Sequence, residues 1–325
     1  MSEQARPTRI LTAIDSKAWE HPADRAALNA VRKIPGFDQV LRALFGFFGE
    51  RPTRLAFQAD SVHVTPTQFA RVHRLYLEAR ATLDAPETPL FVQQSPVLNA
   101  FAYGMNEPFI ILNSYTVKVL DDEELKYVIG HELGHVMSGH VLYNTMIRLL
   151  YALAQMGFPI VGLAARAVLY GLLEWSRKAE LSCDRAGMLA VQDVDPPLRT
   201  LLKFAGGHSA PEANLPDFIK QADEYRESND LADQVFKVLN VLNLTHPFPV
   251  IRVAELRRWL ESGAYERIIA GDYKRRDEQD APYADDLDAA AKSYTESAKE
   301  TFGHAAEAAK KVVDSFRAGF GRSQV

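Results

Sequence analysis

The chain has 325 residues, 47% of them hydrophobic and 24% charged, which is the balance of a globular protein. Its net charge of −5 argues against nucleic acid as a partner, because phosphate binding needs clustered positive charge. Cys183 is the only cysteine, which excludes an intramolecular disulfide and a zinc site built from thiolates. Because residues 1–25 lack the apolar core of a signal peptide, we expect a cytoplasmic location.

The N-terminal region, residues 1–88, is predicted to be mainly helical. Apolar residues recur at helical spacing between Leu28 and Phe45, and a second helical pattern follows from Phe69 to Leu83. The segment 54–64 between them alternates in the manner of a strand. We expect the whole region to pack on the domain that follows it.

Three short segments then predict a small antiparallel sheet, because they are close together, rich in strand-forming residues and separated by turn residues: 90–94, 99–104 and 108–114. Residues 120–143 predict one helix. The four acidic residues 121–124 would occupy its first turn, where the helix dipole favours negative charge. The expected fold class is therefore α+β and mostly helical.

The most apolar part of the chain is the segment 149–175. It contains an uncharged run of 17 residues, which is interrupted by Gln155 and Pro159. A membrane-spanning helix needs about 20 apolar residues, with about 17 as the lower limit. We therefore favour two buried or interfacial helices hinged near Pro159. The alternative is a true membrane span, and the protein could then be associated with the inner face of the cell membrane.

The remainder of the chain is predicted to be helical as far as residue 268. Residues 271–286 are polar and indicate a linker. Beyond them, residues 287–325 predict an amphipathic C-terminal helix rich in alanine. Its positive and negative charges are mixed, which fits a solvated face or a partner helix better than an anionic membrane surface.

The segment His131-Glu132-Leu133-Gly134-His135 is the main candidate for a functional site. On a helix the two histidines differ by only about 40° around the axis, so both imidazoles can bind one ion. Glu132 lies beside them and could act on a water bound to that ion. The competing interpretation is a pair of histidines facing solvent or capped by carboxylates. The apolar residues on both sides of the motif argue against it, because they indicate a buried helix.

A catalytic zinc takes three protein ligands and leaves one position for water. On a continuous helix His140 would lie about 180° from His131, and we reject it as the third ligand on that geometry. Glu180 is the better candidate, because Asp184 follows it by one turn and could hydrogen-bond a ligating histidine. Without the histidine motif, these two acids would more simply form an exposed pair balanced by neighbouring arginines.

Taken together, the chain resembles the HtpX and CAAX prenyl endopeptidase-type family of zinc metallopeptidases, a gluzincin group, over roughly residues 89–265. The resemblance rests on four motifs in the family's order: NAFAYG (99–104), GHELGHVMSGH (130–140), SRKAELSCDRAG (176–187) and THPFPVIRVAELR (245–257). It implies a zincin-like domain that holds one zinc ion on His131, His135 and Glu180. Glu132 would be the general base.

The same resemblance implies roles for residues outside the metal ligands. Asn99 and Ala100 match an edge strand that binds an extended substrate. Asp184 would support a ligating histidine, His246 would face the oxyanion, and Arg252 would support that arrangement. Without the family, His246 would be simply a turn residue before a proline.

The expected function is thus a zinc-dependent endopeptidase that cleaves proteins, in the context of protein quality control. Its metallopeptidase domain would span residues 89–270. The alternative is a protein without turnover, either a zinc-containing peptide-binding chaperone or a membrane-associated interaction protein. Cleavage of casein that a chelator blocks would separate the peptidase from these alternatives.

Overall fold

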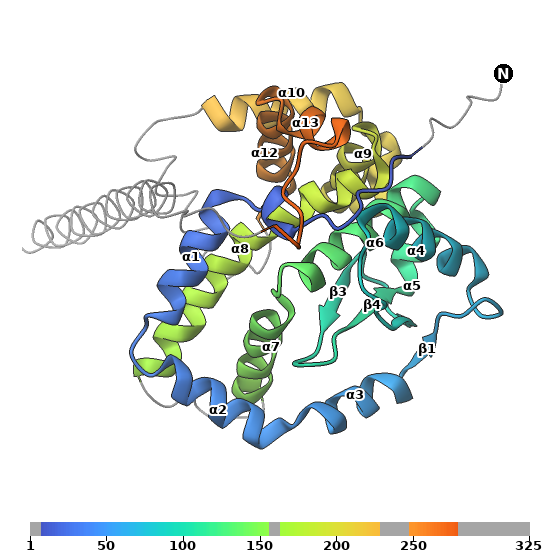
Figure 1. Cartoon of the computed structure of the whole chain (residues 1–325). Helices are drawn as coiled ribbons and strands as arrows, with labels where there is room; N and C mark the ends of the chain where they lie inside the picture. The colour runs from blue at the N-terminus through green and yellow to red at the C-terminus, as the bar shows by residue number, and fades with distance from the viewer. Residues whose placement is uncertain (1–7, 156–162, 228–246, 279–325) are drawn as a thin grey trace, which may run out of the picture.

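A computed structural model describes residues 8–155, 163–227 and 247–278 (Figure 1). The expected helix 287–325 and His246 lie outside the described residues. The helices up to the metal-binding motif are α1 (Pro22–Arg32), α2 (Phe37–Phe48), α3 (Glu50–Ala59), α4 (Ala70–Leu83), α5 (Ser114–Val119) and α6 (Asp122–Met137). Those that follow are α7 (Val141–Gln155), α8 (Leu163–Val191), α9 (Asp195–Gly206), α10 (Leu215–Glu227), α12 (Pro249–Glu261) and α13 (Ala264–Ala270).

Four strands form one small mixed sheet: β1 (Ser61–His63), β2 (Leu90–Gln93), β3 (Ala100–Tyr103) and β4 (Phe109–Asn113), in the spatial order β1-β2-β4-β3. The expected α+β, mostly helical fold class is confirmed, but the sheet is not wholly antiparallel, because β2 and β4 run parallel. Every residue of β4 is buried, so this strand takes the centre of the sheet. As a result β3, which forms an antiparallel pair with β4 alone, becomes an edge strand.

The prediction of a strand at residues 54–64 is mostly wrong. Residues up to Ala59 belong to α3, and only Ser61–His63 form a strand. The carboxylate of Glu50 in the first turn of α3 accepts backbone hydrogen bonds from Met105, Asn106 and Glu107, which anchors the start of the helix. Phe57 on the same helix packs on the sheet face that carries Phe91, Tyr103, Phe109 and Ile111.

The helix expected at 120–143 begins as predicted but ends early. Asp121 and Glu124 form a capping box at the start of α6. At the other end Gly139 has a positive φ of 69°, a conformation that glycine adopts without strain, and the chain turns there into α7. The two halves are therefore separate helices, and His140 lies at the turn between them.

Helices α6 and α8 lie against each other (Figure 1), and the residues at their contact are small. A Cβ placed on Gly134 would lie 2.7 Å from the Cβ of Ala186, and one placed on Gly187 would lie 2.8 Å from the backbone oxygen of Tyr127. Such close approach is possible only where side chains are missing. This close contact between α6 and α8, called the seam below, brings the helix with the two histidines against the helix with Glu180.

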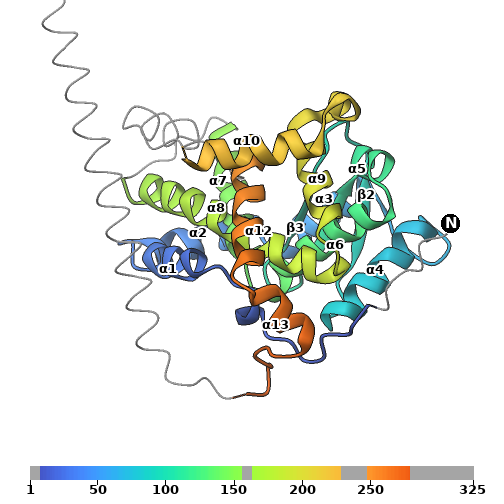
Figure 2. The same ribbon diagram turned by 90° about the horizontal axis from the view of Figure 1, so that it is seen from above.

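The apolar segment 149–175 supplies the end of α7 and the first part of α8, and its expected hinge near Pro159 lies outside the described residues. Its buried residues, among them Leu150, Leu172 and Trp175, share a hydrophobic cluster with α1 and α2. Figures 1 and 2 both show α1 alongside α8, while α9, α10, α12 and α13 gather at one end of the molecule. Within the described ranges, no helix has the length and apolar character needed to cross a membrane.

Candidate active site

The two histidines of α6 and Glu180 of α8 converge on one point. The Nε2 atoms of His131 and His135 lie 3.3 Å and 3.2 Å from the two carboxylate oxygens of Glu180. One ligand atom from each of the three residues falls within 4.8 Å of the other two, and all three side chains are buried. Two imidazole nitrogens and one carboxylate oxygen make a donor set that can hold a metal ion and leave a position for water.

The protonation of the imidazoles also fits a cation. Burial lowers the pKa of His135 to about 4, so its ring is neutral and can offer a lone pair. Burial acts in the same direction on His131, but the carboxylates of Asp184 and Glu180 outweigh it and raise the pKa of His131 to about 10. The negative potential that would hold a proton on His131 would equally attract a metal ion.

Asp184 is held by three partners on the far side of His131. It accepts a hydrogen bond of 2.7 Å from the hydroxyl of Tyr127 and lies 3.0 Å from Nδ1 of His131. Arg252 donates to both of its oxygens, from Nε at 2.8 Å and from a terminal nitrogen. Burial alone would raise the pKa of Asp184, but Arg252 and His131 hold it well below its usual range. The carboxylate therefore stays charged and can accept a hydrogen bond from Nδ1–H of His131, which leaves Nε2 free to bind metal.

His135 has a corresponding partner that sequence reasoning placed wrongly. Because the chain turns at Gly139, His140 folds back, and its Nδ1 lies 3.2 Å from Nδ1 of His135. Nε2 of His140 lies 3.1 Å from Asp24, which also accepts hydrogen bonds from Trp175 (2.8 Å) and Ser182 (2.6 Å). This buried series of hydrogen bonds orients the ring of His135, just as Asp184 orients the ring of His131. Asp24 comes from α1, and no local pattern in the sequence marks it.

Cys183 also lies near this series of hydrogen bonds, with Sγ 3.5 Å from Nδ1 of His140. His135, His140 and Cys183 are close enough together to form another group of potential metal ligands. Burial raises the pKa of the Cys183 thiol well above its ordinary value, and the nearby carboxylates add to this effect. Both ring nitrogens of His140 already face other groups, Nδ1 of His135 and the carboxylate of Asp24, so the group of His131, His135 and Glu180 is the better metal site.

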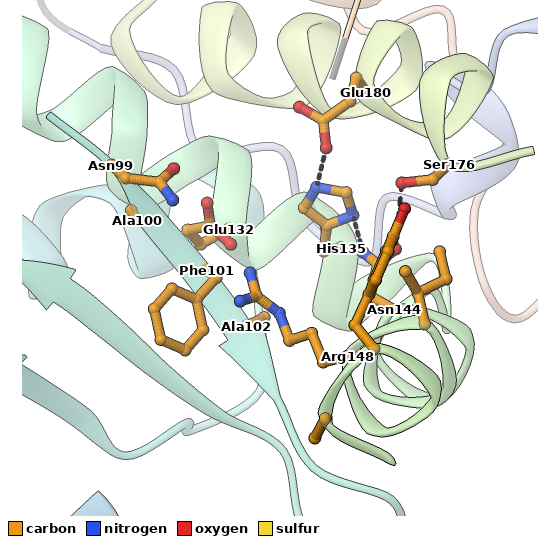
Figure 3. Close-up of a pocket in the computed structure, with 13 residues that line it drawn as sticks. Asn99, Ala100, Phe101, Ala102, Glu132, His135, Asn144, Arg148, Ser176 and Glu180 are labelled. Carbon is orange, nitrogen blue, oxygen red and sulfur yellow. Dashed lines mark hydrogen bonds and ion pairs between the residues drawn. The ribbon is translucent and has the colours of Figure 1, made fainter. Parts of the chain in front are cut away.

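Glu132 points into the cleft beside these ligands (Figure 3). Burial raises its pKa to about 7, while the charges of His131 and Arg148 and the backbone N–H of Ala102 act in the opposite direction. Among the residues that the structure describes, Oε2 of Glu132 is buried and has no hydrogen-bond partner. A carboxylate with a pKa near neutrality and an unsatisfied oxygen is suited to exchange protons with a water molecule.

The cleft consists of two cavities that meet at Glu132. The larger, about 540 Å³, lies between β3 and helices α7 and α8, and the smaller, about 270 Å³, extends toward Phe204 and Arg252. Asn99, Ala100, Glu132 and Glu180 line both cavities. Asn99 and Ala100 therefore lie at the cleft, where the edge strand β3 could accept an extended peptide. The position of His246 is not described, but Pro247 and Pro249 line the smaller cavity.

Comparison with known proteins agrees with this geometry. The sequence profile of peptidase family M48 matches residues 66–260. The plastoglobule-localized metallopeptidase 48 of Arabidopsis thaliana, a chloroplastic protein, is 32% identical over 82% of this chain and 79% of its own length. A protease HtpX homolog of Ralstonia nicotianae is 28% identical over 67% of this chain and 83% of its own, and one of Helicobacter pylori is 29% identical over 45% and 46%. No solved structure matches. The chain therefore belongs to peptidase family M48 and is a metallopeptidase of the HtpX type.

Proposed function

We propose that the chain is a zinc-dependent endopeptidase that cleaves unfolded or extended segments of proteins, in protein quality control. The observation that carries the proposal is the convergence of His131, His135 and Glu180 within 4.8 Å beside Glu132. Two imidazoles and one carboxylate form a donor set found in catalytic zinc sites. An edge strand along the cleft would accept a substrate only in extended form, which favours unfolded chains.

Each residue of the site would have a defined task. His131, His135 and Glu180 would hold zinc, which supplies a Lewis acid that lowers the pKa of water in the site. Glu132 would take the proton of the attacking water and pass it to the leaving amine. His246 would stabilise the oxyanion, as the family resemblance implies. Asp184 and Arg252 would keep His131 in the tautomer that binds metal.

The test combines metal analysis with proteolysis. The purified chain should contain one zinc ion per molecule and should degrade casein in a reaction that a chelator blocks. Glu132→Gln should keep its zinc and lose cleavage, because the amide cannot accept the proton. Glu123→Gln, on the exposed side of the same helix, is the matched control and should behave as wild type. If Glu132→Gln degrades casein as fast as wild type, the proposed mechanism is wrong.

The same assay separates the alternatives. A zinc-containing chain that binds casein but leaves it uncut under all conditions would be a peptide-binding protein without turnover. A chain that cuts casein equally well after complete removal of zinc would contradict the metal assignment. Faster cleavage of casein than of a stably folded protein is expected, because a folded substrate offers no free extended segment to β3.

A further inference from the structure

Arg148 occupies an unusual position in the larger cavity. It lies on α7, is partly buried, and its guanidinium carbon is 4.1 Å from the centre of the Phe101 ring on β3. Figure 3 shows the guanidinium directed into the cavity, toward the side of Glu132. It makes no hydrogen bond and no salt bridge with any residue in the described part of the chain.

The two arginines that are fully buried in the described part of the chain both have an acidic partner, unlike Arg148. Arg252 is paired with Asp184, and Arg177 is paired with Glu174. A guanidinium has five N–H donors, and in a partly buried position an anion that accepts from them is favourable. Burial accordingly lowers the pKa of Arg148, although Glu132, Tyr103 and Glu180 act against that effect. The donors of Arg148 are therefore available to a group that enters the cavity.

The nearby carboxylates do not form a salt bridge with the guanidinium of Arg148. Glu180 faces both imidazoles, and Glu132 has no oxygen within salt-bridge distance of the guanidinium. Stacking on Phe101 also limits the movement of the Arg148 side chain, so the guanidinium is held in place before any ligand arrives. The ligand that fits a planar, pre-positioned guanidinium is a carboxylate, which can accept two parallel hydrogen bonds.

The place of Arg148 indicates which part of a substrate would supply this carboxylate. A peptide paired with β3 directs alternate side chains away from the strand, and the cavity between β3 and α7 would receive one of them beside Glu132. We propose that Arg148 makes the enzyme selective for substrates that place a carboxylate, from an Asp or Glu side chain, in this cavity next to the scissile bond. This inference rests on the proposed peptidase function.

Peptides that differ only in charge test the proposal. Zinc-loaded wild-type chain would be given capped, C-terminally amidated peptides with Glu, Gln or Lys at each position around the cleavage site. At the one position whose side chain enters the cavity, kcat/KM for the peptide with Glu should exceed kcat/KM for the peptide with Gln by about 10- to 100-fold. This is the range of a charge-assisted hydrogen bond in a partly buried site. In Arg148→Gln this ratio should fall to within about threefold. If Arg148 served only to adjust the pKa of Glu132, the substitution would slow all peptides equally and leave the ratio unchanged, which would overturn the proposal.

Arg32→Gln is the matched control. Arg32 also lies over an aromatic ring, at 5.3 Å from Tyr143, but it does not line either cavity. This variant should keep the wild-type ratio of Glu to Gln peptides. Peptides with a free C-terminal carboxylate form a separate arm. A gain that requires the free terminus would overturn the proposal, because the carboxylate bound by Arg148 would then be the end of the substrate chain and not a side chain.

A binding measurement keeps the two proposals apart. Fluorescent Glu and Gln peptides would be titrated onto Glu132→Gln, with and without Arg148→Gln, where no cleavage removes the ligand. Tighter binding of the Glu peptide that depends on Arg148 supports the inference even if the wild type cuts no peptide, a result that would refute the peptidase function alone. Cleavage without any preference for Glu, together with equal binding, overturns the inference and leaves the proposed function intact.

Discussion

Gly187 of α8 offers a sharp test of how helix packing builds the metal site. In Gly187→Ala the new Cβ would lie 2.7 Å and 2.8 Å from ring carbons of Tyr127 and 2.8 Å from its backbone oxygen. Ordinary contact between carbon atoms begins at about 3.5 Å, so α6 and α8 must separate by about 1 Å at this point. Tyr127 is one turn before His131 and bonds Asp184, so the separation acts directly on the site.

Two opposing terms set the size of the effect. Replacing Gly by Ala within a helix contributes about 1 kcal/mol of stability. Overpacking a rigid contact costs about 1–3 kcal/mol. The free energy of unfolding should therefore fall by up to about 2 kcal/mol. Because metal ligands tolerate only about 0.2 Å of displacement, zinc affinity should fall by roughly 10- to 100-fold as well.

Gly171→Ala is a suitable control on the same helix. Its Cβ would also meet its nearest neighbour at 2.7 Å, but that neighbour is the terminal methyl of Ile34, which can rotate away, and the next atom, Cγ2 of Val31, lies 3.3 Å away and has to shift by only a few tenths of an ångström. This variant should be as stable as wild type or up to about 1 kcal/mol more stable, with unchanged zinc affinity. Urea unfolding and zinc titration against a chromophoric chelator measure both quantities. If Gly187→Ala matches Gly171→Ala in both, the close seam does not position the ligands and the reasoning is refuted.

Three further predictions concern the metal site. Glu180→Ala should lower the zinc content of the purified chain, and an undiminished zinc-to-protein ratio would remove this residue from the ligand set. In Asp24→Asn, the amide oxygen would accept the hydrogen bond from Trp175, so the NH₂ group would face Nε2 of His140. His140 would then carry its proton on Nδ1 and His135 would carry its proton on Nε2, the nitrogen that has to bind the metal. Zinc affinity should drop by about 10- to 100-fold, whereas Asp38→Asn on the surface should have no effect, and equal affinities would contradict the hydrogen-bond chain. Finally, zinc at 100 times its dissociation constant should stabilise the fold by about 2.7 kcal/mol, and a melting temperature that does not respond to chelation would show that the site does not bind zinc.

The parts of the site that sequence alone predicted are those that depend on local geometry. Two histidines four residues apart on a helix must share a face, whatever the rest of the chain does. The capping acids at the start of α6 also act within one turn. For the same reason Glu180 and Asp184 could be assigned to one face of α8. Their meeting with the histidines was a hypothesis until the structure placed Glu180 3.2–3.3 Å from both imidazoles.

The remaining features depend on contacts between segments that are distant in the sequence. On a continuous helix His140 would point away from the metal site, but the turn at Gly139 reverses the direction of its side chain. The parallel pairing of β2 with β4 depended on which strand could be buried on both faces, which neighbouring residues do not reveal. Asp24 reaches the site from α1 and Arg148 from α7 only because the packing of α1, α7 and α8 brings them there. The spacing of residues in the sequence determines which side chains point the same way on one helix. Which side chains from different helices meet is decided by how the side-chain volumes fit together between the helices.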